Sequence, residues 1–244
     1  MKGFKLKNNN LKKGKLKTGI SGFDRLVNGG FNLGSSILLS GTPGTGKTIF
    51  ALEFLYRGAQ LDEQGLFVSL EDDAENLRKQ AAQFGWDLQK MEDKGLIRIL
   101  CIPVSEISNQ MVRDLAEMVR KNGIRRLAVD SLSTLAINTP SVQSSISAMG
   151  DFAVRKFIYS FISEIRKLRY TVSLLIAQSP DERSLSCDSI SEFACDGILH
   201  FTFESMGGQF SRSMIVRKMR RENNDEDVHP LEISKKGIVI HNIE

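Results

Sequence analysis

The sequence is poor in the residues that build disulfide frameworks and Cys/His metal sites. It has three cysteines and three histidines in 244 residues, and no Cys-x-x-Cys pair. These residues are Cys101, Cys187, Cys195, His200, His229 and His241. An odd and scattered set of cysteines argues against a disulfide-rich scaffold and against a zinc site of the Cys/His type. We therefore expect the thiols to be buried or incidental.

Long apolar runs are also lacking. No stretch approaches the roughly 18 residues that span a bilayer, and the basic N-terminus lacks the apolar core of a signal peptide. The composition, 41% hydrophobic and 25% charged, is that of an ordinary globular protein, and 244 residues suit one large α/β domain. We expect a cytoplasmic protein with no membrane partner.

Excess positive charge is small overall but gathered at one end of the chain. The net charge is +4, and seven lysines precede the first acidic residue, Asp24. Residues 1–17 contain only isolated apolar side chains, so we expect a flexible basic arm there and a folded domain over residues 18–244. A solvated tail, at most adding an edge strand, is the preferred interpretation of the arm. Contact with nucleic acid or another acidic surface is the alternative.

Strand and helix patterns alternate along the folded domain. Short apolar runs predict strands at residues 37–40, 66–70, 96–102, 127–129, 172–177, 197–203 and 214–217. Apolar residues at steps of three and four predict helices at residues 48–60, 74–84, 111–121 and 154–168. Residues 232–233 and 238–240 predict a C-terminal β-hairpin. This order is typical of an α/β fold with a mostly parallel central sheet and helices on both faces.

A phosphate-binding loop lies between the first strand and the first helix of this series. It has the pattern Gly-x-x-x-x-Gly-Lys-Thr, formed by Gly41, Thr42, Pro43, Gly44, Thr45, Gly46, Lys47 and Thr48. Glycines let backbone N–H groups turn toward phosphates, and the helix N-terminus favours an anion. Lys47 supplies a cation to the β- and γ-phosphates, and the Thr48 hydroxyl can ligate magnesium. The sequence therefore predicts binding of ATP with Mg²⁺.

Acidic residues follow two of the predicted strands. Asp130 ends the apolar strand at residues 127–129, where an acid can orient magnesium through a water molecule. Glu71, with Asp72 beside it, follows the strand at residues 66–70, on the rim where open α/β sheets bind ligands. Glu71 could activate the attacking water. The equal alternative is that these acids only begin the next helix.

Several motifs together resemble the KaiC-like ATPases of the RecA superfamily. They extend from Thr18 to near the C-terminus. The motifs are Thr18-Gly19-Ile20-x-Gly22-Phe23-Asp24, Gly29-Gly30, Gly34, Phe67-Val68-Ser69-Leu70-Glu71-Asp72, Phe84-Gly85-Trp86-Asp87-Leu88, Asp130-Ser131, Lys218-Met219-Arg220 and Lys236-Gly237-Ile238-Val239. The phosphate loop alone does not select this family, whereas the Phe-Gly-Trp-Asp-Leu and Lys-Met-Arg segments do.

The resemblance implies a RecA-like P-loop NTPase core that assembles into hexameric rings with ATP between subunits. It implies a water-activating pair of acids, which falls on Glu71 and Asp72; the family usually has two glutamates there. It also implies that Lys218 and Arg220 reach the neighbouring subunit's γ-phosphate, the alternative being a solvated, charged strand end. Gln178, at the end of the strand at residues 172–177, would sense the γ-phosphate, as in RecA-like proteins.

The resemblance also bears on phosphorylation. Residues 191–196 are similar to the hydrolysing domain of the clock protein in this family, and Glu192 and Phe193 stand where its self-phosphorylating domain carries a Ser-Thr acceptor pair. We therefore do not expect autokinase activity.

Three functions remain open from the sequence. The leading one is slow, Mg-dependent ATP hydrolysis by a ring-forming homo-oligomer that acts on an unidentified protein client. The second is an ATP-gated assembly module with negligible turnover. The third is a RecA-like recombination protein that binds DNA, which is not favoured because no stretch interleaves basic and aromatic residues.

Overall fold

The computed structural model describes residues 14–139, 147–181, 183–203 and 211–242, with the backbone alone for residues 147–151. Its strands are β1 (Lys15–Leu16), β2 (Phe31–Asn32), β3 (Ser36–Gly41), β4 (Gly65–Ser69), β5 (Ile97–Cys101), β6 (Arg126–Asp130), β7 (Val172–Gln178), β8 (Gly197–Phe203), β9 (Arg212–Met219), β10 (His229–Ser234) and β11 (Gly237–Ile240). Its α-helices are α1 (Lys47–Ala59), α2 (Ala74–Ala82), α3 (Leu88–Asp93), α4 (Asn109–Lys121), α5 (Leu132–Ile137), α6 (Ser147–Ile165) and α7 (Ser191–Ala194).

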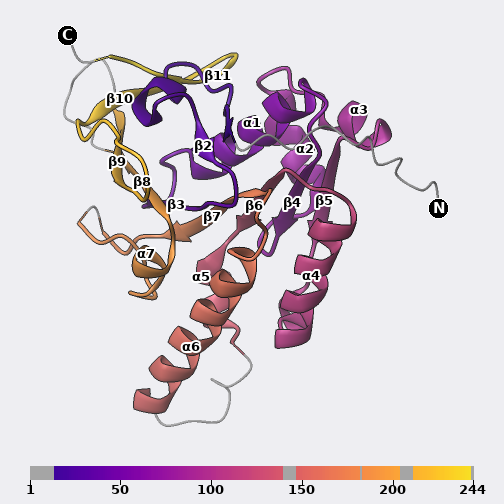
Figure 1. Cartoon of the computed structure of the whole chain (residues 1–244), viewed down its shortest axis with the longest axis vertical. Helices are drawn as coiled ribbons and strands as arrows, with labels where there is room; N and C mark the ends of the chain where they lie inside the picture. Colours follow the sequence, from indigo (N-terminus) through magenta and orange to yellow (C-terminus); the bar gives the residue numbers. More distant parts are fainter. Residues whose placement is uncertain (1–13, 140–146, 182, 204–210, 243–244) are drawn as a thin grey trace.

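A large sheet forms the centre of the molecule (Figure 1). Its strand order is β11-β10-β9-β8-β3-β7-β6-β4-β5. The strands from β8 to β5 run parallel, and β9, β10 and β11 extend the sheet antiparallel beyond β8. The predicted α/β fold with a mostly parallel sheet and a C-terminal hairpin is therefore confirmed.

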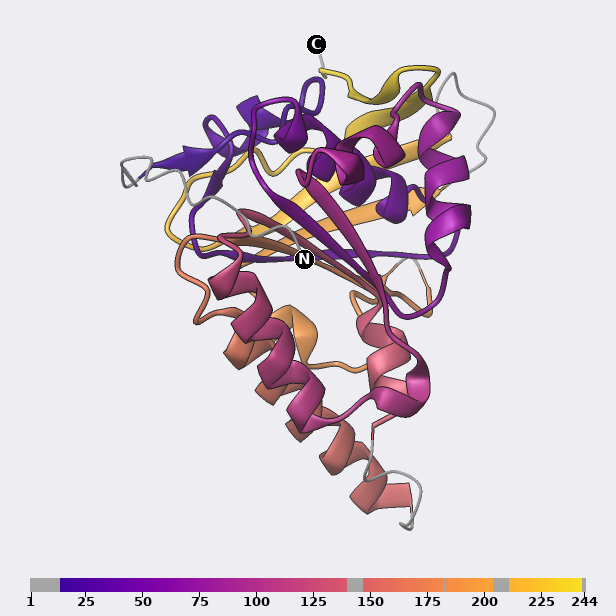
Figure 2. The same cartoon turned by 90° about the vertical axis from the view of Figure 1, so that its right-hand side faces the viewer.

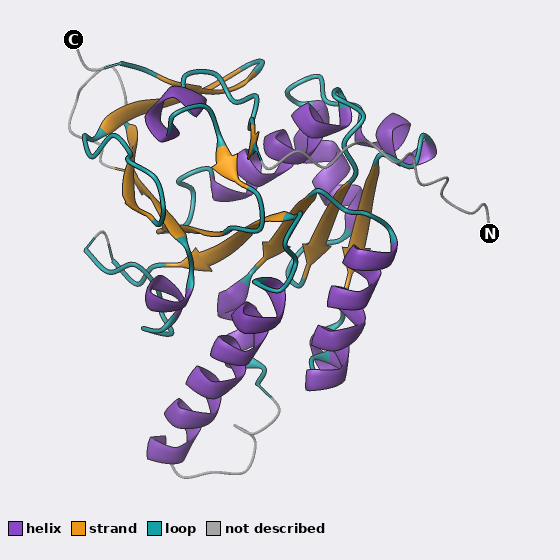
Figure 3. Ribbon diagram, in the orientation of Figure 1, coloured by secondary structure: helices purple, strands orange, loops and turns teal. Residues whose placement is uncertain are grey.

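Helices cover both faces of this sheet (Figures 2 and 3). On one face α1, α2 and α3 pack over an apolar cluster that includes Phe50, Phe54 and Trp86. On the other face α4, α5 and α6 pack over a second cluster, with Leu127 from β6 and Phe161 from α6. Because side chains alternate along a strand, both faces of the central strands are apolar and buried. No helix among the described residues is long and apolar enough to cross a membrane.

Residues 15–17, which the sequence assigns to the basic arm, contact the folded domain. Lys15 and Leu16 form β1, which pairs antiparallel with β2, and Leu16 is buried. The Lys15 amine donates to the Val27 and Asn28 carbonyl oxygens, and Arg126 donates to the Lys17 carbonyl oxygen. One buried leucine and these bonds hold residues 15–17 to the domain. Residues 1–13 of the expected arm lie outside the described residues.

Three short helices were not predicted, because each is too short to show apolar periodicity. Two of them begin at a side-chain cap: Asp87 accepts from the Lys90 N–H to start α3, and Ser131 accepts from the Thr134 N–H to start α5. Such a cap typically stabilises a helix start by about 1 kcal/mol. The third, α7, is a single turn.

Candidate functional site

The segment Gly41 to Thr48 forms a compact loop between β3 and α1. Gly44 and Gly46 have φ angles of 81° and 101°, in the left-handed region that favours glycine. A Cβ at Gly41 would lie only 2.2 Å from the Phe201 carbonyl oxygen, so the strand end admits no side chain there. The Thr45 hydroxyl donates to the Thr42 carbonyl oxygen at 2.9 Å and closes the loop. Pro43 is exposed with Gly44 at the tip.

The Lys47 amine lies inside this loop. Its Nζ donates to the Gly41 and Thr42 carbonyl oxygens at 2.7 and 2.8 Å, and it lies 3.3 Å from the Thr45 hydroxyl. The residue is only 7% exposed. Its charge is therefore held in the concavity of the loop, at the first residue of α1, where the helix dipole also favours an anion.

Thr48 and Asp130 meet beside the loop. The Thr48 hydroxyl donates to Asp130 Oδ2 at 2.7 Å. Burial raises the pKa of the Asp130 carboxyl to about 6; the nearby Glu71 charge adds to this rise, and the Thr48 hydrogen bond opposes it. A hydroxyl and a single carboxylate suit Mg²⁺, which keeps several waters and takes further oxygens from substrate phosphates. The pair can therefore hold magnesium next to a nucleotide bound at Lys47.

Glu71 is turned toward α5. Its Oε1 accepts hydrogen bonds from the Ser131 hydroxyl and, at 2.6 Å, from the Thr134 hydroxyl. The cap of α2 is Asp73, which accepts from the Asn76 N–H at 2.8 Å. The acids at residues 71–73 therefore have different roles. Asp73 caps α2, whereas Glu71 is bonded to residues that follow the end of β6, where Asp130 lies.

Asp72 is held on the other side of the same turn. Its carboxylate accepts from the Gln80 side-chain amide at 3.3 Å, and its backbone bonds to the Ser69 hydroxyl. Asp72 remains close enough for its charge to raise the pKa of Asp130, although less than Glu71 does. The second acid thus lies near the site but is bonded to α2.

Gln178 lies at the same rim of the sheet as the loop. It pairs with Gly41 across β7 and β3, and its N–H donates to the Ser133 hydroxyl at 2.8 Å. Its carbonyl oxygen accepts from the Cys187 thiol and N–H. The side chain is exposed beside the loop.

Lys218 and Arg220 are not brought to the phosphate loop of their own chain. Lys218 pairs with Ile198 on β8, whereas Gly41 pairs with Phe201, three residues further along the same strand. Lys218 and the start of the loop are therefore about 10 Å apart along β8. The Lys218 amine donates to the carbonyl oxygens of Glu192 and Cys195, both at 2.8 Å. Burial lowers the pKa of this amine.

Arg220 follows β9 and lies beside Lys218. Its guanidinium donates to the Phe193 carbonyl oxygen at 3.0 Å and lies 3.9 Å from an oxygen of buried Asp196. Both cations therefore rest against the carbonyl oxygens around α7, a more specific arrangement than a solvated strand end.

Two residues contact the phosphate loop in a way that the sequence did not predict. Arg212, at the start of β9, donates from Nε to the Gly44 carbonyl oxygen at 3.1 Å, and its guanidinium lies over the Phe203 ring. Ile233 on β10 lies so close to Gly46 that a Cβ there would be 3.1 Å from its Cδ1 atom. Neither position carries a motif, since the contact depends on how β9 and β10 fold back along the sheet.

Comparison with known proteins gives a consistent result. The family model described as KaiC, an ATPase family, matches residues 16–244. A UPF0273 protein of Pyrococcus furiosus is 32% identical over 244 residues, covering 93% of this chain and 94% of that protein. A UPF0273 protein of Thermotoga maritima is 33% identical, covering 93% and 96%. The crystal structure of a KaiC-like protein of Pyrococcus horikoshii superposes with a TM-score of 0.81 at 31% identity, covering 94% of this chain and 99% of that one.

Proposed function

Because the chain belongs to the KaiC family of ATPases in the RecA superfamily, we propose that it binds ATP with Mg²⁺ and hydrolyses it slowly in a homo-hexameric ring with the sites between subunits. The family supports nucleotide binding and hydrolysis in general. The observation that carries the more specific proposal is the hydrogen bond between Thr48 and Asp130 beside the loop that encloses the Lys47 amine. These groups are the ones that a Mg-nucleotide needs.

The loop binds and orients the nucleotide. Backbone N–H groups of residues 44–48 face the phosphates, and Lys47 exchanges its two carbonyl partners for phosphate oxygens. Thr48 and Asp130 would hold a magnesium ion, which when bound would supply electrostatic stabilisation of the charge that develops on the phosphates. Arg212 and Ile233 contact the loop from β9 and β10, so they border the nucleotide.

Glu71 acts as the general base in this proposal. Its Oε1 is held by the Ser131 and Thr134 hydroxyls, and no hydrogen bond reaches its Oε2 from any residue that the structure describes. Oε2 is therefore the atom placed to accept a proton from the attacking water, while Oε1 fixes the orientation of the carboxylate. Gln178, which pairs with Gly41 at the end of β7, positions the same water or contacts the γ-phosphate.

The two cations beside α7 act on the neighbouring subunit. Lys218 and Arg220 lie too far along the sheet to touch the phosphates bound in their own chain, yet the Arg220 side chain is exposed. In a head-to-tail ring each subunit presents one face to the loop of the next. Arg220 then stabilises the transition-state charge in trans, as arginine fingers do in other phosphoryl-transfer enzymes.

A second candidate, an ATP-gated assembly module with negligible turnover, is favoured by one observation. The carboxylate of Asp72, which stands where the family usually has a second glutamate, is bonded to Gln80 and so drawn toward α2. Phosphate release from ATP distinguishes the two functions. The hydrolase requires steady release that depends on Mg²⁺ and falls in Glu71→Gln. Native mass measured with and without ATP tests the ring, and the assembly module requires an ATP-dependent change in mass without turnover.

A further inference from the structure

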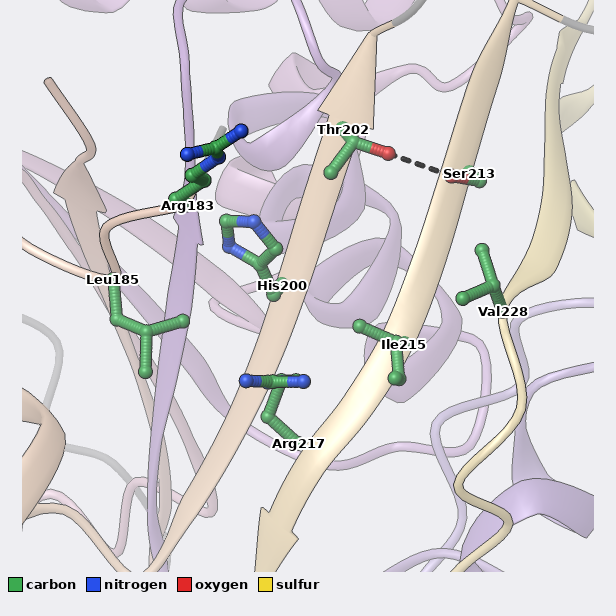
Figure 4. A pocket seen from close by; sticks show the side chains of 8 residues that line it. All are labelled: Arg183, Leu185, His200, Thr202, Ser213, Ile215, Arg217 and Val228. Atoms are coloured by element: carbon green, nitrogen blue, oxygen red, sulfur yellow. Dashed lines mark hydrogen bonds between the residues drawn. The ribbon is translucent and has the colours of Figure 1, made fainter. Parts of the chain in front are cut away.

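A hollow of about 520 Å³ lies on the face of β8 and β9 (Figure 4). His200 and Thr202 project into it from β8, and Ser213 and Arg217 from β9, while Arg183 overhangs it from the loop that follows β7. No motif in the sequence marks this place, because its lining residues are spread singly between Arg183 and Val228.

The hollow is separate from the nucleotide site. Along β8, Leu199 and Phe201 pack into the apolar cluster beneath α1, so His200 and Thr202 point to the opposite face of the sheet. Arg212 on β9 reaches the phosphate loop, and the alternation places Ser213 on the other side. The thickness of the sheet therefore lies between the hollow and the phosphate loop.

The described residues that line the hollow carry a net positive charge, and the Asp181 carboxylate, which accepts from the Arg183 and Ser184 N–H groups, lies outside that lining. Neither the Arg183 nor the Arg217 guanidinium has an ion pair or hydrogen bond with any described residue, and no Asp or Glu is among the described residues that line the hollow. The His200 ring lies between the two arginines, and the Thr202 and Ser213 hydroxyls are 2.6 Å apart on the wall. Planar guanidinium groups that share a cavity with hydroxyls suit the oxygens of a phosphate group.

Two further properties suit a small organic ligand. The volume falls within the range of about 300–1,000 Å³ that is usual for small-molecule sites. Leu185, Ile215 and Val228 give the hollow an apolar wall. The Leu185 carbonyl oxygen accepts a hydrogen bond from the Ser40 hydroxyl, and Ser40 also lies 3.1 Å from His200 Nδ1, so this wall is fixed to the sheet. We propose that the hollow is a second binding site, separate from the phosphate loop, for a small phosphate monoester with an apolar substituent.

The test uses phenyl phosphate as the probe and phenol as its uncharged counterpart. Both are titrated by calorimetry at low salt into the full chain and into Lys47→Ala, in which the phosphate loop has lost its cation. Phenyl phosphate should bind both proteins alike, and phenol should bind neither. Loss of phenyl phosphate binding in Lys47→Ala would place the probe at the phosphate loop and overturn the proposal. The result does not depend on ATP hydrolysis, so it stands apart from the function proposed above.

A double variant, Arg183→Gln with Arg217→Gln, tests the two arginines of the hollow. Arg98→Gln is the control. All three arginines are exposed, and Arg98 lies on β5 at the opposite edge of the sheet. The double variant should bind phenyl phosphate at least about tenfold more weakly, and the control should match the parent. Equal binding by the double variant and the control would overturn the proposal. The proposal would also be overturned if the double variant bound phenyl phosphate as the parent does but had a different native mass. The two arginines would then belong to a contact between copies of the chain.

Discussion

The Thr48 hydroxyl and the Asp130 carboxylate are joined by a hydrogen bond of 2.7 Å, although the two residues are 82 positions apart in the chain. The bond links the start of α1 to the end of β6. It brings a neutral and a charged oxygen to one point, which is the pairing that a magnesium ion can use. It also places the carboxylate where burial makes its ionisation costly, and this cost has a measurable consequence.

Asp130 should make the nucleotide-free protein less stable as pH rises. Its pKa is about 6 in the folded chain against an ordinary 3.8, so the folded state keeps the proton to higher pH than the unfolded state does. Stability is therefore lost as pH rises from about 4 to about 6, by an amount on the order of 3 kcal/mol. In the absence of Mg²⁺, Asp130→Asn should be more stable than the parent at pH 7.5, and its advantage should shrink to about half at pH 5.

Urea unfolding at the two pH values measures this difference. The exposed residue Asp114 supplies the control, and Asp114→Asn should show no comparable dependence on pH. An advantage of Asp130→Asn that stays constant or grows toward pH 5 would contradict the prediction. The same variant should lose Mg-dependent hydrolysis at every pH, because the amide cannot replace the carboxylate near the ion.

The sequence could predict those parts of the fold and the site that are set by residues close together in the chain. The phosphate loop is eight consecutive residues between a strand and a helix, and Asp130 and Glu71 follow strands directly, so the rule for strand ends identifies them. The contacts of Arg212 and Ile233 could not be predicted, because they depend on the register of β9 and β10 with the rest of the sheet. The single turn of α7 likewise depends on residues distant in the chain, since Lys218 on β9 donates to the Glu192 carbonyl oxygen.

The N-terminal boundary shows the same limit. A lysine-rich segment with isolated apolar residues is typical of a flexible arm, yet Leu16 is only 2% exposed. Its burial depends on β2, Phe31–Asn32, which β1 joins. A two-residue strand carries no periodicity of its own, so the sequence alone could not show that Leu16 is buried.

Glu71→Gln should retain nucleotide binding and reduce hydrolysis by about two to four orders of magnitude, the usual contribution of a general base. Glutamine keeps the shape of the side chain and can still accept from Ser131 and Thr134, but it cannot take a proton from water. Phosphate release at saturating ATP gives the rate, and titration with a fluorescent ATP analogue gives the affinity.

Two controls accompany Glu71→Gln. Asp72→Asn should lose less activity, since its carboxylate is bonded to Gln80. Asp73→Ala should mainly reduce stability, by about 1 kcal/mol, because it removes the cap of α2. Parental turnover in Glu71→Gln would mean that the bonds to Ser131 and Thr134 serve only to hold the turn.

Lys47→Ala should abolish nucleotide binding. The amine is the cation inside the loop, and its removal leaves the phosphates without their point charge. The change also removes two hydrogen bonds to loop carbonyl oxygens, so a melting curve must show that the domain still folds. Lys79→Ala is the control, because Lys79 is an exposed lysine with one ion pair to Glu75. Binding of ATP by a folded Lys47→Ala protein at parental affinity would remove the basis for the assigned loop.

The last prediction concerns Arg220, whose guanidinium donates to the Phe193 carbonyl oxygen of its own chain. If subunits share each site, Arg220→Ala should bind ATP through an intact loop and yet lose most of its hydrolysis. Arg98→Ala, at the far edge of the sheet, should keep the parental rate. A cation in trans typically contributes about three to five orders of magnitude in phosphoryl transfer, so the loss should be large.

Mixing the Arg220→Ala and Lys47→Ala proteins distinguishes a site shared between subunits from a site within one subunit. In a ring of Arg220→Ala and Lys47→Ala subunits, some interfaces pair an intact loop with an intact arginine from the next subunit, which neither variant can form alone. Activity should therefore reappear on mixing and vary with the ratio of the two proteins, as expected for a head-to-tail interface. Native mass of mixtures in which one variant carries a tag shows whether subunits exchange. Exchange without any recovered activity would mean that Arg220 stays with Phe193 and Asp196 in its own subunit, where the structure places it, and takes no part in hydrolysis.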